Sequence, residues 1–331
     1  LVAVVDPHPE RAQQIVDSHG GKAYPSLAET LAGTDVDIVV VCTPTGTHGR
    51  LAIEALQAGK DVIIEKPAEI TVARTDEIIA AQQASGRLVT VISQHRFDAA
   101  TEVTVDAIAA GELGRLTSGI ASIDWWRGQT YYDSGDWRGT WELDGGGALM
   151  NQGVHTIDLL VATMGRPVEV FAYTGTLAHD RIEVEDVAVG VVRFESGALG
   201  VLHATTAAYP GMSARLQVHG DRGSVIIDSD VLSFIHRTPS ETTADERAYG
   251  ESSKTINQVE EFPEASGATL SAGADPGQLG SAAHRRQYEN FLAALDGEEE
   301  LRVDLQTNRQ AIAIITGVYE SARTGRPVRL A

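Results

Sequence analysis

Short runs of consecutive apolar residues alternate with amphipathic segments of helical period along the first third of the chain. The apolar runs predict strands over residues 1–5, 37–42, 61–64 and 88–92, each ending in polar residues. The amphipathic segments predict helices over residues 9–18, 48–58 and 72–84. Wholly apolar strands that alternate with helices are typical of a parallel sheet covered on both faces.

The pattern changes after Arg96. It predicts a helix over 99–110, a strand over 116–125, a helix over 148–164 and closing helices over 282–295 and 305–323. Two pairs of alternating strands, 187–194 with 198–204 and 214–219 with 224–228, flank short turns that suit antiparallel hairpins. Residues 238–280 read as long loops with one strand over 259–262. We therefore predict an α/β domain over 1–97 and an α+β domain over 98–331, whose last helix packs back on the first domain.

Composition and charge exclude several classes of function. The formal net charge of −20 over 331 residues argues against a nucleic-acid partner, which needs an excess of Lys and Arg on one face. The single cysteine, Cys42, excludes a disulfide framework and suits the reducing cytoplasm. No apolar stretch has the length of a membrane-spanning helix, so we expect no membrane partner. Because the chain starts at Leu1 within a predicted strand, we expect a glycine-rich phosphate loop to lie upstream of it.

Polar residues follow the predicted parallel strands, and ligands bind at this edge of open parallel sheets. They are Asp6, Thr43, Thr45, Glu65, Lys66, Gln94 and Arg96. The carboxylate of Asp6 could accept hydrogen bonds from an adenosine ribose diol and repel a 2′-phosphate, which favours NAD over NADP. The alternative for Asp6 is the N-cap of the helix that follows.

Lys66 lies between Glu65 and Pro67, directly after a predicted strand. Burial at such a strand end would lower the pKa of the ammonium towards a range useful for acid–base catalysis. The alternative is a solvated surface lysine beside a glutamate. The tripeptide alone does not decide between the two.

Asn151, His155 and Asp158 stand at i, i+4 and i+7 of one predicted helix, a spacing that places them on one face. A histidine flanked by hydrogen-bonding groups can take the hydroxyl proton when a C–H hydride leaves. The alternative is a structural histidine bonded to the backbone. We predict no metal site here, because no second His or Cys stands nearby at ligand spacing.

Residues 125–138 combine aromatic side chains with two arginines. Aromatic faces stack on sugar rings, and arginine binds carboxylate or phosphate with two hydrogen bonds. Packing of these aromatics under a loop is an equally good interpretation. Arg127, Tyr132 and Arg96 are the candidate substrate contacts, with Asn151, His155 and Asp158.

Four motifs in order resemble the glucose–fructose oxidoreductase/inositol dehydrogenase (Gfo/Idh/MocA) family, and the resemblance covers nearly the whole chain. The motifs are CTPTGTH at 42–48, AGKDVIIEKP at 58–67, QHRF at 94–97, and WR at 137–138 followed by GGGALMNQGVHTID at 145–158. No single motif is decisive, but the four together at this spacing are specific. The sequence departs from the family at Asn151, where the family often has Asp.

The resemblance implies a Rossmann domain that binds NAD(P), and a second domain with a large, mostly antiparallel open sheet that forms a homodimer or homotetramer. It implies cofactor contacts at Thr43, Pro44, Thr45, His48, Glu65, Lys66, Trp137 and Arg138, to which strand position adds Asp6 and Gln94. It implies that Lys66 and His155 form the catalytic pair, with Asn151 orienting the substrate hydroxyl. Whether Lys66 or His155 carries the proton stays open.

These expectations describe an NAD(P)-dependent oxidoreductase that moves a hydride between the nicotinamide and a hydroxyl carbon of a sugar, anhydrosugar or inositol. Two rival functions remain. One is a glycoside hydrolase or lyase that uses tightly bound NAD for transient oxidation. The other is a non-catalytic dinucleotide or sugar sensor, although a sensor has no need of Lys66 and His155.

Overall fold

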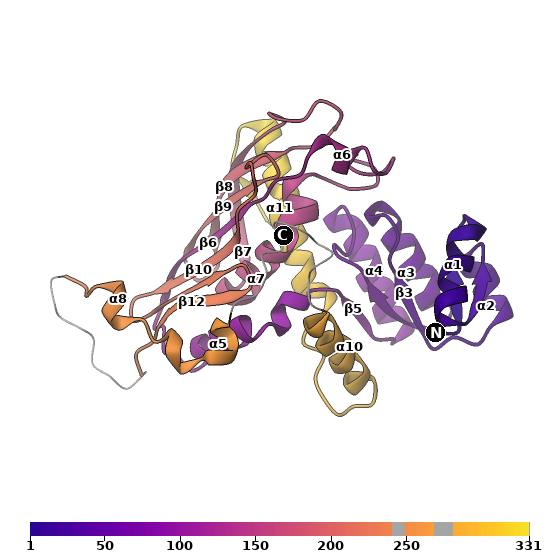
Figure 1. Cartoon of the computed structure of the whole chain (residues 1–331), viewed down its shortest axis with the longest axis horizontal. Coiled ribbons are helices and arrows are strands. Elements are labelled where there is room, and N and C mark those ends of the chain that lie inside the picture. Colours follow the sequence, from indigo (N-terminus) through magenta and orange to yellow (C-terminus); the bar gives the residue numbers. More distant parts are fainter. Residues whose placement is uncertain (240–248, 268–280, 331) are drawn as a thin grey trace.

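The first domain, on the right in Figure 1, is built from parallel strands with helices on either side. The computed structural model describes residues 1–239, 249–267 and 281–330. The elements of this domain are β1 (Ala3–Val5), α1 (Pro9–His19), β2 (Lys22–Tyr24), α2 (Leu27–Gly33), β3 (Ile38–Val41), η1 (Thr45–Thr47), α3 (His48–Gln57), β4 (Asp61–Ile64), α4 (Val72–Ser85), β5 (Val89–Val91) and η2 (Gln94–Phe97). Strands β1 and β2 form one parallel sheet, and β3, β4 and β5 form a second one.

Local sequence fixes the ends of these helices. The hydroxyls of Ser26 and Thr71 accept the backbone N–H groups that open α2 and α4. Gly86 ends α4 in the left-handed conformation that glycine adopts without strain. The apolar residues of β3, β4 and β5 pack against α3 and α4 in one buried cluster. The strands therefore end together, and the polar residues after β3 and β4 are brought side by side.

The second domain is an eight-stranded sheet in the order β12-β11-β10-β6-β9-β8-β7-β13. All neighbouring strands are antiparallel except β6 and β9. The strands are β6 (Leu116–Asp124), β7 (Pro167–Gly175), β8 (Val187–Phe194), β9 (Leu199–Thr205), β10 (Ala214–Gly220), β11 (Ser224–Asp228), β12 (Val231–His236) and β13 (Val328–Arg329). This architecture confirms the predicted combination of a Rossmann-type domain and a large, mostly antiparallel open sheet.

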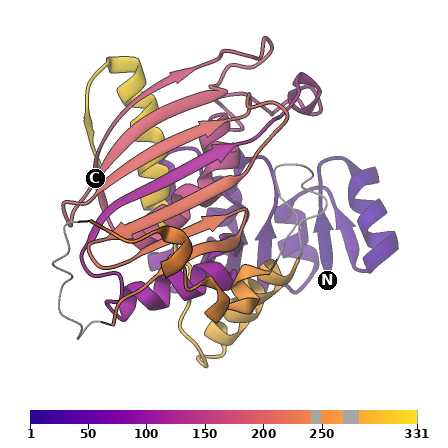
Figure 2. The same cartoon turned by 60° about the vertical axis from the view of Figure 1, so that its left-hand side comes forward.

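One face of the large sheet is covered by helices and the other is bare, as Figure 2 shows from the bare side. Helices α7 (Val154–Met164) and α11 (Leu305–Thr324) pack against the covered face and form the main apolar core with it. Apolar side chains of β8 and β9 stay exposed on the other face, among them Val189, Val191, Leu199 and Val201. The sheet therefore presents a broad apolar surface to its surroundings.

The last two long helices return to the first domain. Helix α10 (Ala282–Leu295) places the Gln287 amide against β5, where it donates to the Val91 carbonyl oxygen at 2.8 Å and accepts from the Ser93 N–H at 2.9 Å. The first residue of α11, Leu305, joins the apolar cluster of the first domain. Arg309, one turn further along α11, pairs with Asp76 of α4.

The remaining described elements are α5 (Ala99–Ala109), α6 (Gln129–Tyr132), η3 (Ala148–Gly153), α8 (Ser253–Ile256), η4 (Val259–Glu261) and α9 (Pro263–Ser266). The strand predicted over 259–262 is wrong, because this segment forms the short 3-10 helix η4. The predicted helix over 148–164 begins with a π-helical turn, η3, before α7. In the described part of the chain, no helix has both the length and the apolar character needed to cross a membrane.

Candidate active site

A cleft of about 320 Å³ opens at the carboxyl ends of β3 and β4, between the two domains. The first domain lines it with Thr43, Pro44, Thr45, Glu65 and Lys66. The second domain adds Trp137, Arg138 and Asn151. Its volume lies within the range of small-molecule sites. The structure therefore gathers most of the residues predicted to contact the cofactor, and two of the predicted catalytic residues, in one cleft.

Lys66 reaches across the cleft and is held by the second domain. Its Nζ atom donates to the backbone oxygen of Asn151 at 2.9 Å and to the Asn151 Oδ1 atom at 3.4 Å. Burial lowers the pKa of the Lys66 ammonium, although the nearby carboxylates of Glu65 and Asp144 act in the opposite direction. The interpretation of Lys66 as a solvated surface lysine is wrong for this structure.

Asp144 fixes the other end of the Asn151 side chain. The Asn151 Nδ2 atom donates to Asp144 Oδ1 at 2.7 Å, and the Gly139 N–H donates to Asp144 Oδ2 at 2.8 Å. Asp144 is only 2% exposed, and burial raises the pKa of its carboxyl group. Sequence reasoning missed this residue, although its position directly before three glycines is a signal that could have found it.

The turn that carries Asn151 is held by the buried carboxylate of Glu185, which lies just before β8. Glu185 accepts the N–H groups of Gly147 and Leu149, each at 2.9 Å, and the hydroxyl of Tyr319 at 3.1 Å. A side chain at Gly147 would collide with the backbone oxygen of Glu185, which explains the glycine. Burial raises the pKa of Glu185 to about 7. Glu185 was also missed, because its partners lie far from it in sequence.

His155 lines a second, smaller cavity of about 20 Å³, together with His95, Trp125, Gln152 and Asp230. This volume has room for roughly one water molecule. Burial and the charges of Lys66, His95 and His284 lower the pKa of His155 well below its ordinary value. No described residue gives its ring a hydrogen bond, so the backbone-bonded structural histidine is not seen here. The lowered pKa favours the neutral ring, and its nitrogens are available to a ligand.

Asn151, His155 and Asp158 do not converge on one site, in contrast to the prediction from their spacing. Asn151 contacts Lys66 in the cleft, and His155 lines the smaller cavity. Asp158 accepts two hydrogen bonds from Arg96, each at 2.6 Å, and both side chains are largely buried. The predicted substrate contacts at Arg96 and Asp158 are therefore wrong, because the two side chains neutralise each other in a buried ion pair.

Arg127 and Tyr132 are also packed away from the cleft. The Arg127 guanidinium lies over the rings of Trp125 and Tyr131, and it donates to the Trp126 backbone oxygen at 2.9 Å. The Tyr132 hydroxyl is buried against the Thr206 hydroxyl at 2.8 Å. The buried Tyr132 hydroxyl is therefore not placed to contact a substrate, whereas the substrate contact at Arg127, whose charge acts on Lys66, stays a prediction.

Two predicted cofactor contacts, His48 and Gln94, are buried behind the cleft. The two ring nitrogens of His48 lie 2.9 Å from the Pro67 oxygen and 2.7 Å from the Thr43 oxygen. His48 therefore ties the loop after β3 to the loop after β4 and does not face the cleft. The Gln94 amide nitrogen lies 3.2 Å from His95 Nε2, and its Oε1 atom has no partner in the described residues.

Asp6 lies after β1, outside the lining of the cleft. Its Oδ1 atom accepts the His8 N–H at 2.8 Å, and His8 occupies the N-cap position of α1. The N-cap interpretation of Asp6 is therefore wrong. Its carboxylate stabilises the turn into α1, and the part of the residue that is exposed remains available to a ribose.

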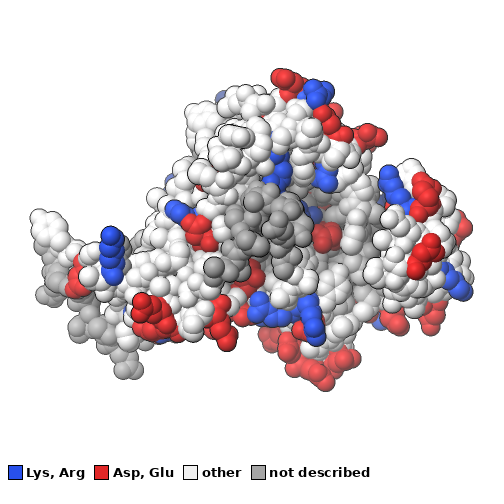
Figure 3. Space-filling model, in the orientation of Figure 1, with Lys and Arg blue, Asp and Glu red and all other residues white. Residues whose placement is uncertain are grey.

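Charge is distributed unevenly around the site. Figure 3 shows acidic side chains along the lower edge and on the right-hand part of the molecule, with several cationic side chains nearer the centre. Within the cleft, Lys66 and Arg138 offset Glu65, and Arg138 lies over the Trp137 ring at 4.5 Å from its centroid. The cleft can therefore accept an anionic ligand despite the acidic surface.

Comparison with known proteins identifies the family. Residues 1–93 match the oxidoreductase family with an NAD-binding Rossmann fold, and residues 101–226 match the GFO/IDH/MocA C-terminal domain. Myo-inositol 2-dehydrogenase of Thermotoga maritima is 29% identical over 242 residues, which are 69% of this chain and 68% of that protein. 1,5-Anhydro-D-fructose reductase of Ensifer adhaerens is 30% identical over 233 residues, or 68% and 67% of the two chains.

A solved structure extends the similarity to the whole chain. The WlbA dehydrogenase of Bordetella pertussis, in complex with NADH and UDP-GlcNAcA, superposes with a TM-score of 0.85. It is 31% identical, and the match covers 100% of this chain and 90% of that one. The two domain matches, in order along the chain, place this protein in the Gfo/Idh/MocA family, as an oxidoreductase with an NAD-binding Rossmann domain.

Proposed function

We propose that this protein oxidises a hydroxyl carbon of a sugar or inositol, with NAD as the hydride acceptor. The observation that carries the proposal is the placement of Lys66 and His155, one from each domain, on either side of Asn151. Lys66 is held in the cleft by Asn151, and His155 follows Asn151 by one helical turn and lines the smaller cavity. A cation and a neutral imidazole on either side of one hydroxyl group supply what alcohol oxidation needs.

The residues of the cleft fit a dinucleotide. Thr43 and Thr45 offer hydroxyls at the strand ends, Glu65 offers a carboxylate for a ribose, and Arg138 offers a cation for a phosphate. The flat face of Trp137 borders the same space. When bound, NAD supplies the acceptor for the hydride.

The proton of the substrate hydroxyl passes to the neutral ring of His155 as the C–H bond breaks. Lys66 donates a hydrogen bond to the same oxygen and stabilises the negative charge that develops on it. Asn151 holds the Lys66 ammonium in place, and Asp144 holds Asn151. The products are a carbonyl compound, a protonated His155 and a reduced cofactor, so that electrons and protons balance.

Two substrate classes follow from the relatives. The inositol and anhydrosugar enzymes point to an uncharged ring, whereas the full-length similarity to a dehydrogenase crystallised with a nucleotide-linked sugar acid points to an anionic substrate. Arg138 is already assigned to the cofactor, so the cleft does not favour either class and the substrate panel tests both.

The test is NADH formation by the protein with NAD and a panel of inositols, free sugars, anhydrosugars and UDP-linked sugar acids. A signal with one compound would support the dehydrogenase and name its class. NAD binding without NADH formation, together with release of an aglycone from a glycoside, would replace it by the hydrolase. NAD binding with neither reaction would leave the sensor.

Variants of the catalytic pair give a second test. We expect Lys66→Met and His155→Ala each to lower turnover by at least about a hundredfold while NAD still binds, the scale of positioned acid–base catalysis. Lys60→Met is the matched control, because Lys60 pairs only loosely with the exposed Asp35, at 3.9 Å. Near-normal turnover in either catalytic variant would remove that residue from the mechanism.

The bare face of the sheet supports assembly into a homo-oligomer. Val191 and Val201 are paired across β8 and β9, and both are about half exposed, as is the neighbouring Leu199. An apolar strip of this kind on an open sheet is typical of an interface between copies of a chain. We therefore include a homodimer or homotetramer in the proposal.

A further inference from the structure

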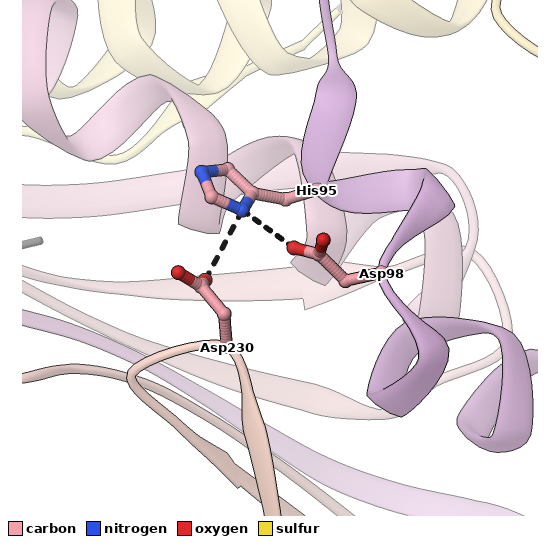
Figure 4. Close-up of side chains that lie close together, drawn as sticks. All are labelled: His95, Asp98 and Asp230. Carbon is pink, nitrogen blue, oxygen red and sulfur yellow. Dashed lines mark hydrogen bonds and ion pairs between the residues drawn. The ribbon is translucent and has the colours of Figure 1, made fainter. Parts of the chain in front are cut away.

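His95 lies between two carboxylates from different parts of the chain, as Figure 4 shows. Its Nδ1 atom is 2.7 Å from Asp98 Oδ2 and 3.1 Å from Asp230 Oδ1. His95 belongs to η2 at the end of the first domain, whereas Asp230 lies in the turn between β11 and β12 of the second. The contact therefore joins the two domains beside the smaller cavity, which both His95 and Asp230 line.

The local backbone places both carboxylates beside His95. Asp98 occupies the N-cap position of α5, yet its side chain makes no capping hydrogen bond. Asp230 and Ser229 form the two-residue turn between β11 and β12, with φ angles of 66° and 51°. They are the two non-glycine residues with positive φ in the described part of the chain. Positive φ at both residues is what a two-residue hairpin turn requires, and this turn presents Asp230 to His95.

His95, Asp98 and Asp230 have ligand atoms close enough together to hold a metal ion, but the Nδ1 to Asp98 distance is that of a hydrogen bond. An N–H to carboxylate hydrogen bond between charged groups spans about 2.7–2.9 Å. Two ligand atoms of a tetrahedral zinc ion, each about 2.0–2.2 Å from the metal, would lie about 3.3 Å apart. The Nδ1 to Asp98 distance fits the first arrangement.

The surroundings of the other ring nitrogen are compatible with a second proton on His95 once the Gln94 amide is turned. Its Nε2 atom faces the amide nitrogen of Gln94 at 3.2 Å, while the buried Gln94 Oε1 atom has no partner in the described residues. The amide group of Gln94 fits its surroundings in either of two orientations. Turned by 180°, it would place its oxygen against His95 Nε2, which would then donate an N–H hydrogen bond to it. Burial lowers the pKa of His95, but the hydrogen bonds and charges of Asp230 and Asp98 outweigh it and raise the pKa to about 10.

The cation lies against the catalytic histidine. The rings of His95 and His155 meet edge to face, with centroids 5.0 Å apart. The other charged or titratable groups near His155 are Lys66, after β4, His284 of α10, and Asp230, which lines the same cavity and whose negative charge is paired with His95. One turn along α7, the Asp158 carboxylate is neutralised by Arg96. His95 is thus the cation in edge contact with the His155 ring.

We propose that His95, clamped as an imidazolium between Asp98 and Asp230, is a positioning residue that keeps the neighbouring His155 neutral and ready to accept a proton. A unit charge about 5 Å away, across a partly solvated site, shifts a pKa by about one to two units. His95 therefore extends the pH range in which His155 is a free base towards acid. The role in catalysis rests on the proposed function, but the charge states themselves do not.

The direct test is NMR of the full chain with isotope-labelled histidine. We expect the His95 signals to be those of an imidazolium from about pH 6 to about pH 9, and those of His155 to be neutral over the same range. In His95→Gln, the pKa of His155 should rise by about one to two units. A neutral His95 at pH 7, or an unmoved His155 in a folded His95→Gln variant, would overturn the proposal.

Three further measurements sharpen the result. Asp230→Asn keeps the His95 ring and removes one carboxylate, so His95 should lose its proton at lower pH. This variant tests the clamp even if His95→Gln does not fold. His8→Gln is the control, because the exposed His8 side chain is not among the groups that act on His155, and its removal should leave His155 unchanged. Loss of the His95 signals on addition of zinc, reversed by a chelator, would show a metal centre and refute the clamp.

The two proposals fail separately. With an active substrate, the acid limb of the kcat/KM profile should move to higher pH in His95→Gln by the same one to two units, with roughly unchanged NAD affinity. If His155 titrates as expected by NMR and no substrate is oxidised, the proposed function fails and the clamp stands. If turnover is found and the acid limb does not move, the clamp fails and the proposed function stands.

Discussion

Replacing Asp158 by Asn should destabilise the fold strongly without removing a substrate contact. Asp158 and Arg96 form two hydrogen bonds of 2.6 Å, and their side chains are 3% and 11% exposed. The amide of Asn is nearly the same size as the carboxylate but carries no charge. The change therefore leaves the Arg96 guanidinium buried beside a neutral group.

The size of the effect follows from this burial. Removing one partner of a buried ion pair costs about 3–5 kcal/mol, since the remaining charge stays desolvated. The unfolding entropy of a chain of this length converts that cost into a fall of about 4–7 °C in the melting temperature. Replacing both residues by apolar ones, as in Arg96→Met with Asp158→Leu, should recover most of the loss.

The assay is thermal unfolding followed by circular dichroism, with NADH formation measured on the same samples. Asp133→Asn is the matched control, because Asp133 makes the same two-bond pairing with Arg181 but is exposed to solvent, and its melting temperature should not change measurably. A melting temperature within about 1 °C of the wild type, combined with a raised KM, would refute the reasoning and restore Asp158 as a substrate contact.

Three other expectations can be checked independently. NAD should bind more tightly than NADP because of the Asp6 carboxylate, and Asp6→Ser should narrow the difference; equal affinities in the unchanged protein, measured by titration, would remove this claim. Glu185 has its pKa raised to about 7, so the native state holds this proton more tightly than the unfolded state. The stability that this proton contributes is present below about pH 4.5 and is lost, by up to about 3 kcal/mol, as the pH rises through 7. The free energy of unfolding, measured with denaturant at several pH values, should therefore depend less on pH in Glu185→Gln than in the unchanged protein; an equal pH dependence would contradict this expectation. Val191→Lys, on the bare sheet face, should shift the mass measured by light scattering towards the monomer, and an unchanged mass would place the interface elsewhere.

The regular elements were predictable where hydrophobic period and stop signals agree. The strand over 61–64 and the helix over 282–295 have the predicted bounds. Strands β2 and β13 are only three and two residues long, too short for a period to be read. Strands β7 and β12 and helix α2 were also missed. The apolar positions in 259–262 suit a strand, but the segment packs against β12 as a 3-10 turn instead.

The site was predictable only as far as its residues follow strand ends or motifs. Thr43, Glu65 and Lys66 line the cleft because parallel strands end at one edge. His48 shares that position, yet its partner Pro67 is 19 residues away and no local pattern shows that both ring nitrogens are used. Asp230 reaches His95 from a distant hairpin turn, which single-chain patterns do not encode, whereas Asp144 is near Asn151 in sequence and was missed because it belongs to no periodic pattern.

The return of α10 and α11 to the first domain makes the large sheet an insertion within a discontinuous nucleotide-binding module. Residues 1–97 supply the strands of that module, and Gln287 and Leu305 complete its surface from the far end of the chain. Recombination with a relative at a single crossover near residue 97 would separate these parts. A chimaera that exchanges substrate preference while keeping cofactor binding therefore needs one crossover after η2 and one before α10, and the residues of α11 that face the sheet must come from the same parent as the sheet.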